Sequence, residues 1–178
     1  MELQNTPAHR EYVARLRSRF ADYLLVLEVR HGSWNEPGIL DFLESLEIGV
    51  CNIEQTLFHR LQKPAAVATS GVGYVRLHGR NYKQWFAEKS APQKRHDYLY
   101  SVDELEPWIE RIKAVEHRSR DTYAVTNIHY VRQAVVNAVE ISSIPKGHPV
   151  PAPPKLVERY PELREIVRDT DEAGARST

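Results

Sequence analysis

The chain has 178 residues, of which 42% are hydrophobic and 27% charged, and its 24 basic and 24 acidic side chains give zero formal net charge. This length and composition are typical of one globular domain. Zero net charge argues against a general nucleic-acid or membrane-surface binder, because such proteins carry a basic excess. The single cysteine, Cys51, excludes an intramolecular disulfide.

No segment approaches the ~20 consecutive apolar residues that are needed to cross a bilayer. The first residues also lack the apolar run of a signal peptide, because charged side chains interrupt it at Arg10, Glu11 and Arg15. We therefore expect a cytoplasmic protein without a membrane partner.

Hydrophobic spacing in the first part of the chain predicts a helix, a strand and a second helix. An apolar stripe from Val13 to Phe20 predicts a helix over residues 8–22. The apolar run at 24–29 is typical of a strand that is buried on both faces. The second helix is expected after Pro37, because proline favours the first turn of a helix.

Two strands and a capped helix are expected next. The strands cover residues 50–54 and 73–78, with a long connection between them. Ser101 and Glu104 form a capping-box pattern, in which each side chain accepts a hydrogen bond from a backbone amide at the start of a helix. The apolar stripe that follows predicts the buried face of this helix.

A fourth strand is expected over 122–126, and the last apolar stripe runs from 131 to 139. Residues 1–144 therefore read as an α/β domain. Short apolar strands that alternate with amphipathic helices favour a parallel sheet with helices outside it. Residues 145–178 are rich in proline and predict an extended arm with a short helix around 162–167 and a disordered end.

Polar side chains recur at the carboxyl ends of all four strands. Within each strand they alternate with apolar residues, so the apolar faces can meet helices while the polar faces converge. In barrels and in open α/β sheets, ligands bind at this end of the strands. The residues of this pattern are Glu28, Arg30, Asn52, Glu54, Arg76, His78, Arg80 and Asn127.

Two interpretations of this pattern remain open. In the first, Glu28 and Glu54 neutralise the arginines in a charge-paired barrel interior that carries no chemistry. In the second, three arginines and a histidine against two glutamates leave a positive excess that binds a small anionic ligand, including a phosphorylated one. Guanidinium groups present planar forks that fit carboxylate and phosphate groups. The expected ligand-binding residues are Arg30, Asn52, Glu54, Arg76, Arg80 and Asn127.

If the site is catalytic, His78 is the candidate general acid or base, and Glu28 is its orienting or proton-accepting partner. A divalent metal held by Glu28, Glu54 and His78 is a sharper hypothesis. Nearby arginines would oppose a cation, and no ligand-spacing signature is present, so no metal or other cofactor is assigned. A third hypothesis is that the chain is a nucleic-acid enzyme that uses the same arginines. Zero net charge argues against it, because binding to the phosphate backbone needs a basic excess.

Four segments resemble the DUF72 (YecE-like) family in their order and spacing. They are Glu28-Val29-Arg30-His31-Gly32-Ser33-Trp34; Tyr74-Val75-Arg76-Leu77-His78-Gly79-Arg80; Asp97-Tyr98-Leu99-Tyr100-Ser101 with Glu104-Leu105 and Trp108; and Gln133-Ala134 with Asn137-Ala138. The resemblance covers about residues 8 to 165. It implies a TIM-barrel-like fold and a family without a settled biochemical function.

The resemblance also implies which residues belong to the site. The family's motif positions correspond to Glu28, Arg30, Arg76, His78, Arg80 and Asn127, and Tyr98 and Tyr100 match its aromatic loop. One departure is the end of the last strand, where a Phe-Asn-Asn-like run is replaced by Thr126-Asn127-Ile128.

Family members are longer, and this chain resembles their C-terminal half or two-thirds. Four strands cannot close a barrel of the usual eight. We therefore expect a truncated or split family member that either pairs with a second copy or with a missing N-terminal half, or is only marginally stable alone. The alternative to ligand binding is a non-catalytic remnant or assembly subunit without an activity of its own.

Overall fold

The computed structural model describes residues 3–54, 66–81, 97–128 and 132–169. The chain forms two compact units. The first unit comprises Met1–His78 and Glu110–Val125, and the second comprises Gly79–Ile109 and Thr126–Thr178.

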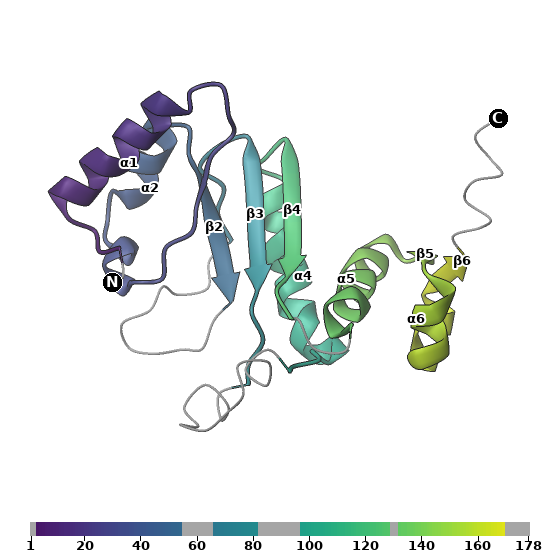
Figure 1. Ribbon diagram of the computed structural model, residues 1–178. Coiled ribbons are helices and arrows are strands. Elements are labelled where there is room, and N and C mark those ends of the chain that lie inside the picture. Colours follow the sequence, from purple (N-terminus) through teal and green to yellow (C-terminus); the bar gives the residue numbers. More distant parts are fainter. Residues whose placement is uncertain (1–2, 55–65, 82–96, 129–131, 170–178) are drawn as a thin grey trace, which may run out of the picture. The chain divides into compact units, whose positions relative to one another are not determined.

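The first unit is built on a four-stranded sheet with the strand order β1-β2-β3-β4, and the helices lie beside it (Figure 1). Strands β1, β2 and β3 pair in parallel, and the arrow of β4 runs in the same direction as that of β3 (Figure 1). The strands are β1 (Val26–Leu27), β2 (Gly49–Glu54), β3 (Val72–Leu77) and β4 (Asp121–Thr126), and the two N-terminal helices are α1 (Pro7–Arg19) and α2 (Ile39–Ser45). The predicted α/β class and the four predicted strands are confirmed.

Helix α1 begins where its sequence favours a start. The Thr6 hydroxyl accepts a hydrogen bond from the His9 amide at 3.2 Å, and Pro7 occupies the first helical position. Strand β1 is much shorter than the apolar run at 24–29, because only Val26 and Leu27 pair with β2. Leu24, two residues before the first paired residue, is exposed.

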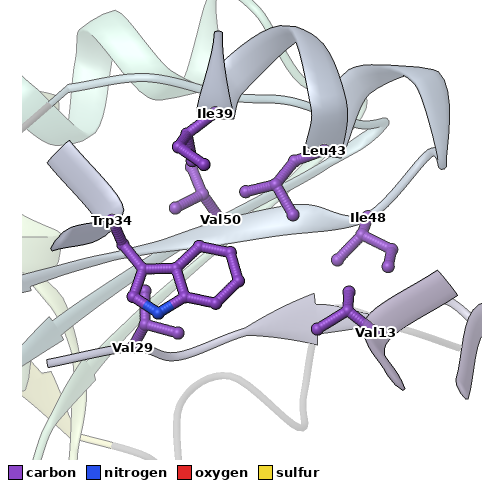
Figure 2. Packing of buried hydrophobic residues seen from close by; sticks show 7 residues of the cluster. All are labelled: Val13, Val29, Trp34, Ile39, Leu43, Ile48 and Val50. Carbon is purple, nitrogen blue, oxygen red and sulfur yellow. The ribbon is translucent and has the colours of Figure 1, made fainter. Parts of the chain in front are cut away.

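A hydrophobic cluster joins α1 and α2 to the sheet (Figure 2). Figure 2 shows the Trp34 indole between the segments that carry Val29 and Val50. The indole Nε1 donates a hydrogen bond to the Leu3 carbonyl at 2.9 Å, so the polar atom of this buried ring has a partner. Each large side chain buried here contributes roughly 1.5–3 kcal/mol of transfer free energy. The cluster consists of Val13, Val29, Trp34, Ile39, Leu43, Ile48 and Val50.

Helix α4 (Val102–Glu116) begins at the predicted capping box. The Ser101 amide donates to Glu104 Oε2 at 3.0 Å, and the Glu104 amide donates to Ser101 Oγ at 3.4 Å. The other end of α4 packs closely on β3 in the first unit. A Cβ atom at Gly73 would lie only 2.4 Å from Val115 Cγ1, so a side chain at this position would prevent the approach of helix and strand.

The second unit contains α5 (Gln133–Ser143) and the segment that follows it. That segment was expected to be an extended arm with a short helix around 162–167. Instead, β5 (Val150–Ala152) pairs in parallel with β6 (Val167–Asp169). Between these strands lie α6 (Pro154–Arg159) and a 3₁₀ helix, η4 (Pro161–Glu165). The expected short helix is therefore present as η4, whereas the expected extended course of the segment is not.

The segment after α5 packs because its apolar residues meet those of α5. Val136 and Val139 of α5 form one cluster with Leu156 and Leu163. The expected disordered end, from residue 170 onward, lies outside the described residues. The sequence suggested a separate arm that starts at residue 145. In the structure, however, α5 and residues 150–169 belong to one unit.

Two amide side chains of α5 hold the segment before α4 in the second unit. Asn137 Oδ1 accepts from the Tyr100 amide at 3.1 Å, and its Nδ2 donates to the Tyr100 carbonyl at 3.0 Å. One turn earlier, Gln133 Oε1 accepts from the Tyr98 amide at 3.1 Å. Positions four apart lie on one face of a helix, so the spacing of these amides matches the alternating backbone of the extended segment.

Candidate functional site

The strand register decides which polar residues share a face of the sheet. Cys51 is aligned with Tyr74, and Ile53 is aligned with Arg76. Residues that are aligned on neighbouring strands point to the same side. The face that carries Arg76 therefore also carries Cys51 and Ile53; we call it the inner face.

Asn52 and Glu54 lie on the opposite face, because they are aligned with Val75 and Leu77. The expectation that they share a polar face with Arg76 is wrong. Alternation within a strand shows which residues face together, but it does not show how one strand is offset against the next. Here β2 and β3 are offset so that the polar residues of one strand lie beside the apolar residues of the other.

Asn52 uses its side chain to hold the backbone that leads into β3. Its Nδ2 donates to the carbonyls of Val67 at 2.8 Å and Tyr74 at 3.1 Å, and its Oδ1 accepts from the Val67 amide at 3.0 Å. The Glu54 side chain is buried, and its backbone carbonyl accepts from the His78 amide at 3.3 Å. A proposed role of either residue in ligand binding stays a prediction.

Glu28 is the centre of a cluster of charged residues at the end of β1 and β3. Arg76 Nη1 donates to Glu28 Oε2 at 2.5 Å. Arg30 Nη2 donates to the other oxygen, Oε1, at 3.1 Å. His78 Nε2 also lies 3.5 Å from Oε1. One carboxylate thus contacts two guanidinium groups and an imidazole, and we call these four residues the Glu28 cluster.

The cluster keeps Glu28 ionised. Burial raises the pKa of the Glu28 carboxyl, but the hydrogen bonds from Arg76 and Arg30 and the nearby positive charges outweigh burial, so that this pKa lies below its usual value. At neutral pH Glu28 is therefore an anion that accepts hydrogen bonds. A carboxylate with a lowered pKa is a weak proton acceptor, so Glu28 suits the orienting role better than the base role.

The members of the cluster differ in how far they are buried. The side chain of His78 is 6% exposed, whereas that of Arg30 is 45% exposed. The Arg76 Nε atom is buried and has no hydrogen-bond partner among the residues that the structure describes. A buried N–H without an acceptor costs about 1–3 kcal/mol, so a ligand oxygen at this atom would be favourable.

Arg80 and Asn127, which were also predicted as ligand-binding residues, belong to the second unit, and their role in ligand binding stays a prediction. Arg80 Nη1 donates to Glu104 Oε1 at 3.2 Å, and its guanidinium lies 5.8 Å from the centre of the Tyr100 ring. Tyr98 donates to the same Glu104 oxygen. Burial raises the pKa of Glu104, but these hydrogen bonds and those from Ser101 lower it below its usual value. Glu104 was predicted only as a helix cap, and its second partner, Arg80, could not be inferred from the local pattern.

Cys51 lies on the inner face close to the cluster. Burial, together with the charge of Glu28, raises the pKa of its thiol to about 12. A thiol with this pKa is almost entirely protonated at neutral pH, which makes it a poor nucleophile and a poor metal ligand.

In residues 3–54, 66–81, 97–128 and 132–169, no group of three His, Cys, Asp or Glu side chains is arranged to hold a metal ion. The hypothetical set of Glu28, Glu54 and His78 is divided between the two faces of the sheet, because Glu54 points away from Glu28. A groove of about 290 Å³ lies elsewhere, in the second unit, where it is lined by residues that include Val157, Arg164 and Arg168.

Residues 2–155 match the family model described as "Protein of unknown function DUF72". The chain belongs to the DUF72 family. The resemblance of the four sequence motifs is thus confirmed. No functionally curated protein matches the sequence.

Solved DUF72 structures are similar to this chain. A DUF72 protein from Thermotoga maritima has 29% sequence identity and a TM-score of 0.73, over 81% of this chain and 54% of that one. One from Enterococcus faecalis has 20% identity and a TM-score of 0.72, over 80% and 54%. A second structure of that protein has 18% identity and a TM-score of 0.67, over 80% and 57%. The two with lower identity support the fold alone.

The chain thus spans about half the length of the solved DUF72 proteins that it matches. The parallel sheet with flanking helices is the TIM-barrel-like arrangement that the motifs implied. None of the helices that the structure describes is both long enough and apolar enough to cross a membrane.

Proposed function

We propose that this DUF72 chain binds a small anion, such as a carboxylate or phosphate group, at the Glu28 cluster. The observation that carries the proposal is that one carboxylate is shared by Arg30, Arg76 and His78. Two guanidinium groups against one carboxylate leave a net positive charge beside a strand end, which attracts an anion. Glu54 does not reduce this charge on the inner face, because it points to the other side of the sheet.

The geometry of the arginines favours an oxyanion as the ligand. Arg76 uses Nη1 for Glu28, and its Nε offers a further donor direction. Arg30 is partly exposed, so its guanidinium group adds positive charge at the solvent side of the cluster. Planar guanidinium groups bind carboxylate and phosphate oxygens in pairs.

If the bound anion reacts, His78 is the candidate acid or base. Its Nε2 lies 3.5 Å from the ionised Glu28, which would stabilise a protonated imidazole and fix the orientation of the ring. We assign no reaction, because a charged pair of this kind serves binding as well as proton transfer.

The alternative is that the cluster only stabilises the sheet. The contacts of both arginines and of His78 with Glu28 favour this function, since ion pairs without chemistry also occur in barrel interiors. The two functions differ in what added anions do to the protein.

Thermal unfolding of the chain, with and without added anions, tests the proposal. We expect inorganic phosphate, or a sugar phosphate, to raise the Tm more than sodium chloride at equal ionic strength, because a ligand that binds only the folded state stabilises it. The Arg76→Ala variant should lose this rise. The matched control is Arg15→Ala, which removes a well-exposed arginine of α1 and should keep the rise. A Tm that no anion raises above the chloride control would contradict the proposal.

A further inference from the structure

The groove of about 290 Å³ in the second unit is formed by one continuous stretch of the chain, residues 152–168. Its walls come from strand β5, helix α6, the 3₁₀ helix η4 and strand β6. It shares no residue with the Glu28 cluster, which belongs to the first unit. Five of its seven lining residues also lie beyond residue 155, where the match to the family model ends. The groove is therefore a separate feature from the anion site proposed above.

The floor of the groove is apolar and is held in place by the core of the unit. Ala152 is buried, and Val157 and Val167 are half-buried. Val167 packs against the hydrophobic cluster of α5, and Leu156, which precedes Val157 in α6, is buried in that cluster. A volume of about 300 Å³ is at the lower end of the range for small-molecule pockets. The groove therefore suits a small ligand with an apolar body.

The charged residues that line the groove sum to one positive charge, because Arg164 and Arg168 stand against Glu158. Both arginines are exposed, and neither guanidinium has an ion-pair partner within the part of the chain that the structure describes. The arginines of the Glu28 cluster, in contrast, already share a carboxylate. Guanidinium groups without an acidic partner beside an apolar floor favour a ligand that brings its own carboxylate.

We propose that the groove binds a monocarboxylate with an apolar chain, such as a medium-chain fatty acid. The carboxylate pairs with Arg164 and Arg168 at the exposed rim, and the chain lies on the apolar floor. One surplus positive charge matches one carboxylate, whereas the second charge of a phosphate group would have no surplus cation to balance it beside Glu158. Charge and shape thus select an acid of single charge with an apolar chain.

A series of straight-chain acids tests the role of the apolar floor. We expect the affinity of the full chain to rise from acetate to hexanoate to octanoate in an NMR titration. Each added methylene should tighten binding by about two- to fourfold, because it leaves water for an apolar surface. Octanol should bind about tenfold more weakly than octanoate, because it lacks the charge that pairs with arginine. An affinity that does not change from acetate to octanoate, or equal binding of octanol and octanoate, would overturn the proposal.

Substitutions at the rim test where octanoate binds. Arg164→Ala and Arg168→Ala should each weaken octanoate binding by about tenfold, because each removes a charged hydrogen-bond donor. Glu158→Gln should tighten it by about two- to threefold, because a like charge is removed. Arg159→Ala is the matched control, since Arg159 is an exposed arginine of α6 that does not line the groove, and this variant should bind octanoate as the wild type does. Unchanged binding in both Arg164→Ala and Arg168→Ala would overturn the proposal.

Arg76→Ala separates the groove from the Glu28 cluster, because a carboxylate is also a candidate ligand of that cluster. Arg76 belongs to the first unit, so this variant should bind octanoate with the wild-type affinity and keep the dependence on chain length. If octanoate binding is lost in Arg76→Ala and kept in Arg164→Ala, the acid binds at the Glu28 cluster and the groove proposal is overturned. Loss of the phosphate effect in Arg76→Ala, with octanoate binding intact, would support both sites independently.

A competition experiment distinguishes a small molecule from a protein segment as the occupant. A short acidic peptide should displace octanoate only at a higher concentration than hexanoate does, because it lacks an apolar chain that fits the floor. A peptide that displaces octanoate more effectively than hexanoate would assign the groove to a protein partner and would overturn the proposal. Circular dichroism checks that each variant is folded, and all the substituted groove residues are exposed.

Discussion

Arg76 and Glu28 are 48 positions apart in the sequence, yet Arg76 Nη1 lies 2.5 Å from Glu28 Oε2. Glu28 directly follows β1 and Arg76 lies in β3, and strand β2 lies between these two strands. The ion pair therefore crosses over a strand whose own inner face is apolar, formed by Cys51 and Ile53. It links the edge of the sheet to its middle where backbone pairing of β1 is limited to two residues.

Replacing Glu28 with glutamine should have opposite effects on the stability of the chain and on its affinity for an anion. Glu28→Gln should lower the free energy of unfolding by about 1–2 kcal/mol, because charged hydrogen bonds to Arg30 and Arg76 are weakened. It should also tighten phosphate binding by about tenfold, equal to about 1.4 kcal/mol, because a competing negative charge is removed. Chemical denaturation and phosphate titration measure the two effects. Weaker phosphate binding in this variant would argue that Glu28 itself orients the ligand.

The lowered pKa of Glu28 makes stability depend on pH. In the folded chain this pKa lies below the ordinary carboxyl value of 4.5, so the unfolded chain binds the proton more readily. The stabilisation is complete above about pH 5, falls as the pH drops through 4.5 toward the folded pKa, and is absent below both values.

The difference in unfolding free energy between wild type and Glu28→Gln should thus shrink on acidification. Urea denaturation at about pH 7 and pH 3 measures it. The control is Glu11→Gln, at a well-exposed residue of α1, for which the difference should stay small throughout. If wild type and Glu28→Gln differed in unfolding free energy by the same amount at both pH values, the lowered pKa of Glu28 in the folded chain would be contradicted.

Gly73 should tolerate no side chain. Gly73→Ala places a Cβ atom 2.4 Å from Val115 Cγ1 and 2.7 Å from Ser119 Oγ, so α4 must move away from β3. We expect a loss of about 1–3 kcal/mol of unfolding free energy. Gly71→Ala is the control, because nothing lies within 4 Å of its added carbon. Thermal unfolding should show a clear difference between the variants, and similar Tm values would show that the close contact is not needed.

Asn137→Ala should destabilise the second unit. The substitution removes two hydrogen bonds to the Tyr100 backbone inside the core, at a cost of about 2–3 kcal/mol. It also removes the donor to Glu140, whose pKa is already raised by burial. Gln133→Ala removes a half-buried amide one turn earlier and should cost less. Calorimetry compares the two variants, and an equal loss would contradict the special role of the buried amide.

Much of the fold could be predicted because it is encoded locally. The apolar stripe of α1 and the capping box at Ser101 specify helices without reference to distant residues. The strands β2, β3 and β4 were expected within one or two residues of their observed bounds. The segment after residue 144 was misjudged, since its prolines suggested an extended chain, whereas burial of Leu156 and Leu163 against α5 gives it a folded structure.

The candidate site could be predicted only in part. Glu28, Arg76 and His78 do come together. Glu28 and His78 directly follow the carboxyl ends of β1 and β3, and Arg76 is the last but one residue of β3. The positions of Asn52 and Glu54 depend on the offset between β2 and β3, which side-chain alternation within a strand cannot supply. When the register between two strands shifts by one residue, the side chains of one strand change faces relative to those of the other. Asn52 and Glu54 therefore lie on the face opposite Arg76, although the pattern within β2 alone was read correctly.

The position of the Glu28–Arg76 ion pair across β2 also has a kinetic consequence. The pair cannot form until β2 has docked on β3 and β1 has docked on β2, so we expect it to be absent from the folding transition state. Its loss should then accelerate unfolding and leave the folding rate nearly unchanged. A single carboxylate near the edge of the sheet would thus govern how long the folded state persists rather than how fast it is reached.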